Sequence, residues 1–302
     1  MRILDIKTTY RCNNLCYLCC QNRELRMKDS DMTFDEVVTI VKKEQMSGVD
    51  KIVLTGGEPL LNKDIINIIS YAHDMNIKNI QLQTNARLLK DKTFLRRIIE
   101  AGVNEFGISL HGHTAKMHEN FSNTESYCDV ITALENLKEY PCNIVINCVI
   151  TESNFENLEE LINFVQTNKY AAVLQFAYLH AIGNAENQFD KTISLTEASK
   201  RIKDAIKHCA DGSIKIFTEA IPFCLMQGFE KHVAELYFDN EVVTYDKFKR
   251  REYSKNVNGI LKIKGEKCEK CIFNSICQGV WAEYPLTFGY DELIPVVNFE
   301  RH

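Results

Sequence analysis

The stretch RCNNLCYLCC occupies residues 11–20 and contains the spacing CxxxCxxC at Cys12, Cys16 and Cys19. Three thiolates this close together in one turn can hold one iron-sulfur cluster. A four-iron cube takes four cysteine ligands in ferredoxins, whereas this triplet has no fourth partner at the ferredoxin spacing. One iron would therefore be left open to a substrate or a cofactor, and the loop is predicted to be a metal site.

Two further motifs are TGGEP at residues 55–59, about forty residues after the cysteines, and SLHG at residues 109–112. Together with the triplet, over roughly residues 1–209, they resemble the radical S-adenosylmethionine (radical SAM) superfamily. In that family the open iron chelates SAM, and an electron from the reduced [4Fe-4S] cluster cleaves its sulfonium to give a 5′-deoxyadenosyl radical. The alternative is a zinc knuckle or a disulfide pair, but zinc sites typically use CxxC pairs completed by a second pair or by histidines.

The resemblance implies roles for individual residues. The TGGEP segment would hydrogen-bond the methionyl amino group of SAM, with Glu58 shaping the loop, and Ser109 matches a position that contacts SAM. Asn147 is a candidate for contacting the ribose or carboxylate of SAM, or else a satisfied interior amide. Leu18 stands where the family usually has an aromatic residue against adenine. The predicted cofactor-binding residues are Leu18, Gly56, Gly57, Glu58, Ser109 and Asn147.

Other polar residues lie near the ends of the expected strands. His111, His113 and His180 are candidates for touching substrate, although a lone histidine is more often structural than catalytic. Residues 183–185, Gly-Asn-Ala, resemble the adenine-contacting turn of the family.

Six segments with strand-like patterns are each followed by apolar residues at helical spacing. The expected strands are residues 2–8, 51–54, 80–83, 105–110, 144–150 and 172–179. This alternation predicts an α/β fold with a parallel sheet and helices outside it. Six units are too few to close an eight-stranded barrel, and the resemblance implies an open, TIM-like (β/α)6 partial barrel over residues 1–210. Every motif follows a strand, as in barrels whose active sites lie at the C-terminal ends of the strands.

From residue 211 the alternation is expected to stop, and residues 211–302 form a predicted second domain. Its cysteines are Cys224 and the CxxCx5C set of Cys268, Cys271 and Cys277. This set resembles the auxiliary iron-sulfur domains called SPASM or, when shorter, twitch, and it would hold at most one cluster. A structural zinc site is the alternative. Cys224 is either the fourth ligand, which we favour, or a free thiol that donates a hydrogen atom to a substrate radical.

The composition excludes some classes of protein. Among 302 residues, 36 are Lys or Arg and 41 are Asp or Glu, so the net charge of −5 offers no general attraction for nucleic acid. No apolar run reaches the length of a membrane span, and no signal peptide is apparent. The 12 cysteines in a chain expected to be cytoplasmic favour metal ligation over disulfides.

The sequence therefore predicts a radical SAM enzyme, either an oxidoreductase or a peptide-modifying maturase, that cleaves SAM reductively and abstracts hydrogen from a substrate. The expected substrate is a ribosomally made peptide that undergoes epimerisation, cross-linking or dehydrogenation. One alternative is dehydrogenation of a small polar metabolite such as an aminocyclitol, and another is a non-catalytic zinc-binding or regulatory protein on the same fold. The expected partners are the peptide or small-molecule substrate and an electron donor of the flavodoxin or ferredoxin type.

Overall fold

The computed structural model describes residues 1–21, 31–186, 188, 192–209, 212–237, 241–246 and 249–298. Their largest sheet has the strand order β7-β6-β5-β4-β3-β2-β1-β8-β9. The strands are β1 Arg2–Thr9, β2 Lys51–Gly56, β3 Asn79–Thr84, β4 Glu105–Ser109, β5 Asn143–Val149, β6 Val173–Ala177, β7 Lys215–Glu219, β8 Glu241–Asp246 and β9 Lys249–Glu252. The six expected strands are confirmed as β1 to β6, each within two residues at either end.

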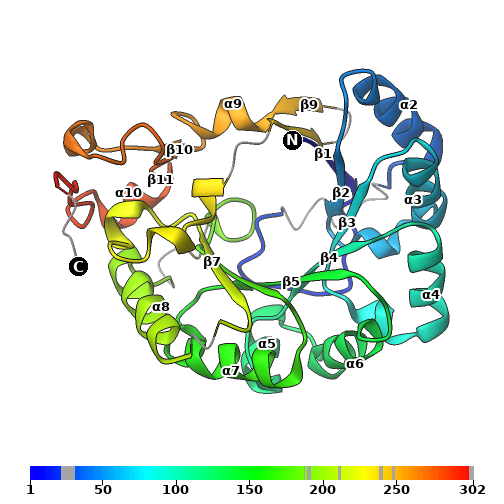
Figure 1. Cartoon of the computed structure of the whole chain (residues 1–302), viewed down its shortest axis with the longest axis horizontal. Coiled ribbons are helices and arrows are strands. Elements are labelled where there is room, and N and C mark those ends of the chain that lie inside the picture. The colour runs from blue at the N-terminus through cyan, green and yellow to red at the C-terminus, as the bar shows by residue number, and fades with distance from the viewer. Residues whose placement is uncertain are drawn as a thin grey trace.

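Helices surround the sheet on its outer side (Figure 1). They are α2 Phe34–Gln45, α3 Ile65–Asp74, α4 Lys92–Glu100, α5 Ala115–Ser122, α6 Tyr127–Leu137, α7 Leu158–Asn168 and α8 Leu195–Cys209. The reason is visible in α3, whose buried residues are Ile65, Ile68, Ile69 and Ala72, one face of a helix. The predicted α/β partial barrel is therefore confirmed, and its sheet does not close on itself within the described residues.

The sheet continues beyond the point where the alternation was expected to stop, so that expectation is wrong. Strand β7 pairs in parallel with β6, with Ala177 opposite Glu219. Strand β8 returns to pair in parallel with β1, with Leu4 opposite Val243. The pattern was missed because β7 is short and reads Lys-Ile-Phe-Thr-Glu, with polar residues at both ends. The division into domains at residues 210 and 211 stays a prediction, although strands from both sides share this sheet.

The C-terminal segment adds small elements beside the barrel, coloured orange to red in Figure 1. They are α9 Tyr253–Val257, β10 Lys262–Ile263, β11 Val280–Trp281 and α10 Tyr284–Phe288, and β10 pairs antiparallel with β11. Among the helices that the structure describes, none combines the length and apolarity needed to cross a membrane.

Glu44, in the last turn of α2, ties the two ends of the sheet-forming chain together. Its side chain is 3% exposed and accepts hydrogen bonds from Arg2 Nη2 at 3.1 Å, Tyr245 Oη at 2.8 Å and Arg250 Nε at 2.8 Å. Burial acts to raise the pKa of Glu44, but the hydrogen bonds from Arg250, Tyr245 and Arg2 outweigh it, so the pKa lies below its ordinary value. The carboxylate thus joins α2 to β1, β8 and β9.

Replacing Glu44 by glutamine is expected to lower the free energy of unfolding by about 3 kcal/mol at pH 7, because two arginines then share an uncharged partner. A lowered pKa gives stability that is complete above the ordinary value of 4.5 and is lost as the pH falls through the folded-state value. The difference between wild type and variant should therefore shrink at acidic pH in urea unfolding experiments. The surface control Glu100→Gln should change stability by less than about 0.5 kcal/mol. A Glu44→Gln difference that does not depend on pH would contradict this account.

Candidate active site

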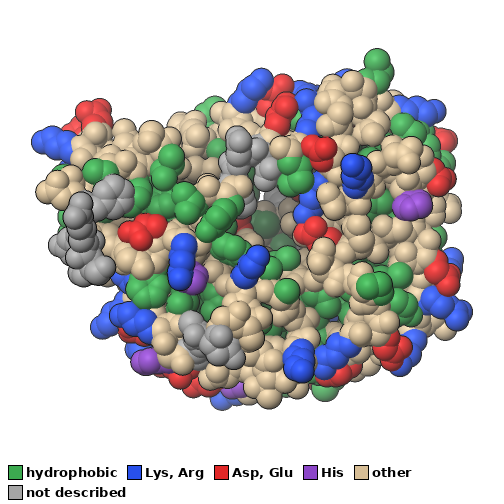
Figure 2. Space-filling model, in the orientation of Figure 1, with side chains coloured by type: hydrophobic (Ala, Val, Ile, Leu, Met, Phe, Trp, Pro, Cys, Tyr) green, Lys and Arg blue, Asp and Glu red, His purple; other side chains and the backbone are tan. Residues whose placement is uncertain are grey.

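A cavity of about 440 Å³ opens inside the barrel, on the side where the strands end. Figure 2 shows a hollow near the middle of the molecule in this view. Of the residues singled out from the sequence, the cavity is lined by Cys12, Cys16, Cys19, Leu18, Gly56, Gly57, Ser109, Asn147 and His111. The structure therefore brings the three separate motifs to one place, and the volume is in the range of small-molecule sites.

The protein itself holds the cysteine loop in position. The Sγ atom of Cys12 accepts hydrogen bonds from the backbone N of Asn14 at 3.5 Å and from Asn85 Nδ2 at 3.8 Å. The Sγ atom of Cys19 accepts one from the backbone N of Gln21 at 3.4 Å. N–H groups pointing at sulfur favour the thiolate form that binds metal. The residues present therefore fit a cluster bound through three cysteines.

The two glycines of TGGEP pack directly against the end of β1. The backbone N of Gly57 donates to Thr9 O at 2.7 Å, and that of Glu58 donates to Arg11 O at 2.7 Å. A Cβ at Gly57 would lie 2.3 Å from Arg11 O and 2.5 Å from Tyr10 O, and one at Gly56 would lie 2.2 Å from Thr9 O. A side chain at either position would push the TGGEP loop away from the cysteine loop.

Glu58 lies behind the cavity wall and is fully buried. Its Oε1 accepts hydrogen bonds from Thr84 Oγ1 at 2.7 Å and from Leu60 N at 3.1 Å, and its Oε2 accepts one from Asn85 N at 2.7 Å. Burial raises the pKa of Glu58 to about 7, against the effect of these donors. The geometry supports a role in shaping the loop, since Glu58 connects the turn after β2 to the turn after β3.

Asn147 presents a polar atom to the cavity wall. Its Oδ1 is buried and has no hydrogen-bond partner among the described residues, and it stands opposite Ser109 in the register of β4 and β5. Buried polar atoms are normally satisfied. The carbonyl is thus not that of a satisfied interior amide, and a ligand with N–H or O–H donors, such as the amino or ribose groups of SAM, would satisfy it.

The three histidines have different surroundings. His111 is buried in the cavity wall, accepts a hydrogen bond from Val149 N through Nδ1 at 3.2 Å and lies against Phe121. Burial lowers the pKa of His111 well below its ordinary value, with the neighbouring His118 adding to the effect. His113 and His180 are not among the described residues that line the cavity.

The turn at residues 183–185 contacts the cysteine loop directly. The backbone N atoms of Asn184 and Ala185 donate to Cys19 O at 3.0 and 3.3 Å. Gly183 has φ +65°, and a Cβ there would lie 2.6 Å from Cys20 O. The turn after β6 therefore supports the loop that carries the thiolates.

The sequence analysis did not predict that a group of polar side chains lines the inside of the barrel. We call this group the polar belt. With Thr55 of the TGGEP motif, this part of the lining includes Gln81, Gln83, Gln175 and Glu219, and the described part of the lining contains no Lys or Arg. A signal was present in Gln81-Leu82-Gln83, where polar residues alternate with an apolar one in an expected strand. Glu219 was missed because β7 itself was not expected.

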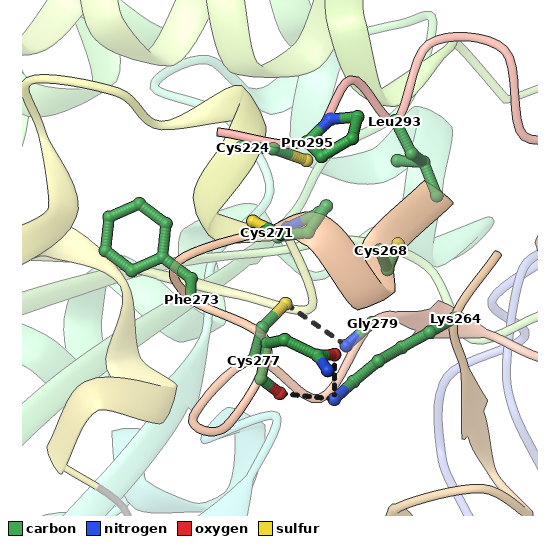
Figure 3. Close-up of a pocket in the computed structure, with 11 residues that line it drawn as sticks. Cys224, Lys264, Cys268, Cys271, Phe273, Cys277, Gly279, Leu293 and Pro295 are labelled. Atoms are coloured by element: carbon green, nitrogen blue, oxygen red, sulfur yellow. Dashed lines mark hydrogen bonds between the residues drawn. The ribbon is translucent and has the colours of Figure 1, made fainter. Parts of the chain in front are cut away.

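A second, smaller pocket brings the C-terminal cysteines together. Figure 3 shows the sulfurs of Cys224, Cys268, Cys271 and Cys277 around one space. Burial, with the other three thiols nearby, raises the pKa of Cys224 to about 12. Cys224 is not among the described residues that line the barrel cavity. Its position supports the interpretation as a fourth ligand over that as a hydrogen donor.

Comparison with known proteins identifies the family. Residues 6–165, more than half of the chain, match the family described as the Radical SAM superfamily. The chain belongs to the radical SAM superfamily. Enzymes of this superfamily use a [4Fe-4S] cluster and SAM, and they need a reductant and a substrate.

Several curated relatives match about two thirds of this chain. The GTP 3′,8-cyclase of Clostridium botulinum strain Hall is 31% identical over 209 residues, which are 67% of this chain and 64% of the relative. The probable GTP 3′,8-cyclase of Sulfolobus acidocaldarius is 26% identical over 202 residues, which are 67% of this chain and 63% of the relative. The chain thus spans less than two thirds of the length of these relatives.

Solved structures share the fold at low identity. SuiB of Streptococcus suis bound to the precursor peptide SuiA has a TM-score of 0.68 and 17% identity, covering 92% of this chain and 71% of SuiB. The enzyme anSMEcpe with bound AdoMet has a TM-score of 0.58 and 19% identity, covering 69% of this chain and 60% of that one. Identities this low show the fold alone.

The expectation of peptide modification is wrong, because curated relatives such as those of Sulfolobus acidocaldarius and Clostridium perfringens are named as probable or established GTP 3′,8-cyclases. The alternatives of an aminocyclitol dehydrogenase and a non-catalytic zinc protein are set aside with it, and neither the oxidoreductase assignment nor a SPASM domain is supported. The physical reason is that CxxxCxxC and TGGEP lie at the predicted cofactor site. They therefore carry no information on whether the substrate is a peptide or a small molecule.

Replacing Gly57 by alanine is expected to weaken SAM binding by about tenfold or more and to lower the iron bound at the cysteine triplet. The added Cβ would overlap the backbone oxygens of Arg11 and Tyr10. Iron analysis and SAM titration of anaerobically purified protein measure both effects. Gly48→Ala is a control for backbone strain without overlap, because φ +76° at Gly48 disfavours any side chain although a Cβ there would meet nothing within 4 Å; it should keep the wild-type iron content and SAM affinity. Wild-type iron and SAM affinity in Gly57→Ala would refute the packing argument.

Proposed function

We propose that this radical SAM enzyme abstracts hydrogen from a small polar substrate, and that the substrate class is a purine nucleoside or nucleotide. The observation that carries the proposal is the single cavity shared by the three loop cysteines, the TGGEP glycines and the interior polar belt. The relatives named GTP 3′,8-cyclase support a nucleotide over other small molecules.

Within this proposal, some residues bind the cofactors and others bind the substrate. Cys12, Cys16 and Cys19 hold the cluster, while Ser109 and Asn147 orient SAM from the wall formed by β4 and β5. When bound, the cluster and SAM supply the one-electron chemistry that removes a hydrogen atom.

The side chains of the polar belt can form hydrogen bonds with the edge of a nucleobase. Thr55 Oγ1 donates to Gln83 Oε1 at 3.2 Å, and the nearby carboxamides of Gln81 and Gln175 each carry both a donor and an acceptor. Neutral groups of this kind read hydrogen-bonding edges without requiring charge. Since the described lining lacks Lys and Arg, it favours a base and its sugar over a chain of phosphates.

The second pocket is proposed to hold an auxiliary [4Fe-4S] cluster on Cys224, Cys268, Cys271 and Cys277. Four cysteines are the complement of ligands that a cube prefers. With every iron ligated by protein, such a cluster would carry an electron and would not bind substrate. We also propose that the electron donor is of the flavodoxin or ferredoxin type and that the protein is cytoplasmic.

The central test is SAM cleavage by anaerobically reconstituted protein with dithionite. 5′-Deoxyadenosine should form, and GTP should raise its rate by about tenfold through productive hydrogen abstraction. Cys16→Ala should form none. Fully loaded protein that never cleaves SAM would refute the catalytic role. Cleavage that responds to neither GTP nor guanosine would refute the substrate class.

Replacing Cys224 by alanine tests the second cluster. Loss of one of four thiolates should lower total iron by roughly half, because the auxiliary cube would be lost while the SAM cluster stays. The exposed Cys128 provides the control, since Cys128→Ala should keep all its iron. Undiminished iron in Cys224→Ala would exclude ligation, and wild-type protein that contains zinc in place of the second iron complement would exclude an auxiliary cluster.

A further inference from the structure

The wall of the cavity at β7 carries a carboxylate that no cofactor-binding motif includes. Glu219 is the last residue of β7 and lines the cavity beside Gln175. Gln175 Nε2 donates a hydrogen bond to Glu219 Oε2. In its ionised form a carboxyl group has two oxygens with about four lone-pair sites, so Glu219 can take further N–H donors while it keeps this one. Burial and the neighbouring Glu235 raise the pKa of Glu219.

A second carboxylate lies behind the first. The Glu235 side chain is 5% exposed, and its Oε1 accepts hydrogen bonds from Lys262 Nζ at 2.6 Å and from the backbone N of Ala220, the residue after Glu219, at 2.8 Å. Its Oε2 is buried without a hydrogen-bond partner among the described residues. The neighbouring carboxylates of Glu219 and Glu235 thus have one buried lysine, Lys262, between them. This part of the cavity wall therefore has fewer hydrogen-bond donors and less positive charge than two carboxylates can accept.

The surrounding groups do not supply the missing positive charge. The Tyr253 phenol lies near Glu219, Glu235 and Asp5, and its pKa is raised by burial and by these three carboxylates. The ammonium group of Lys7, which also lies near Asp5, is paired with Asp246 at 3.3 Å. Buried acceptors without donors cost free energy. A ligand that brings N–H donors to this wall would recover part of that cost.

We propose that Glu219, with Gln175 beside it and Glu235 behind it, binds a substrate group that presents two adjacent N–H donors, as the amide and amino edge of a guanine-type base does. This inference rests on the proposed function and names the base within the purine class. A carboxylate accepts two parallel N–H bonds in a geometry that a base without the amino group cannot match. The absence of Lys and Arg from the described lining is consistent with a neutral donor edge at this wall.

The test compares guanosine with inosine, which lacks the exocyclic amino group, by calorimetric titration of SAM-bound, cluster-loaded protein. Wild type should bind guanosine about tenfold or more tightly than inosine. Glu219→Gln should lose that preference, because the carboxamide replaces one acceptor by a donor, and Glu219→Asp should keep part of it. The exposed Glu139, which pairs with Lys92, provides the control Glu139→Gln, with wild-type selectivity expected.

Equal binding of guanosine and inosine by wild type would overturn the inference, and this measurement needs no variant to fold. A guanosine preference that survives in folded Glu219→Gln would overturn it as well. The proposed function fails separately: if guanosine binds through Glu219 but neither guanosine nor GTP accelerates SAM cleavage, the subsite stands and the substrate assignment falls.

Discussion

The cofactor site depends on one close contact between backbones. The end of β1 and the turn after β2 approach so closely that the N–H groups of Gly57 and Glu58 bond directly to Thr9 O and Arg11 O. Two consecutive glycines permit this approach, because a Cβ at either one would overlap a carbonyl oxygen. The cysteine loop begins at this contact and is supported further along by the turn at Asn184. The position of the thiolates is therefore set by backbone packing, with the strands as the fixed frame.

The elements that could be predicted from the sequence are those recognised by a pattern of neighbouring residues. The six strands were predicted correctly because each carries alternating or consecutive apolar residues, and the motifs after them could be recognised because each has its own spacing. Strand β7 could not be predicted in this way, since Lys215-Ile216-Phe217-Thr218-Glu219 looks like an ordinary surface segment until Gln175 and the rest of β6 lie beside it. Because β7 was not predicted, Glu219 was not recognised as a site residue. The part of the cavity wall that is proposed to face the substrate was therefore not predicted either.

The substrate was mispredicted for a related reason. Residues such as Cys12 and Gly57 belong to chemistry that radical SAM enzymes share, so they define a class of reaction and leave the substrate open. Cys224 shows the opposite case: its role was ambiguous in the sequence because about forty residues separate it from Cys268. The fold places it with three other thiols in one pocket, which supports the proposed role as a ligand.

The pairing of β1 with β8 has a consequence for biosynthesis. Arg2 and Glu241 are neighbours in the sheet, so during synthesis β1 lacks one of its two partners until the chain has reached β8, after almost the whole barrel. Contacts this distant along the chain slow folding. The thiols of Cys12, Cys16 and Cys19 directly follow that strand, and exposed thiolates are open to oxidation. During synthesis the metal-binding loop is therefore present before the sheet that holds it is complete, and its thiols are open to oxidation during that time.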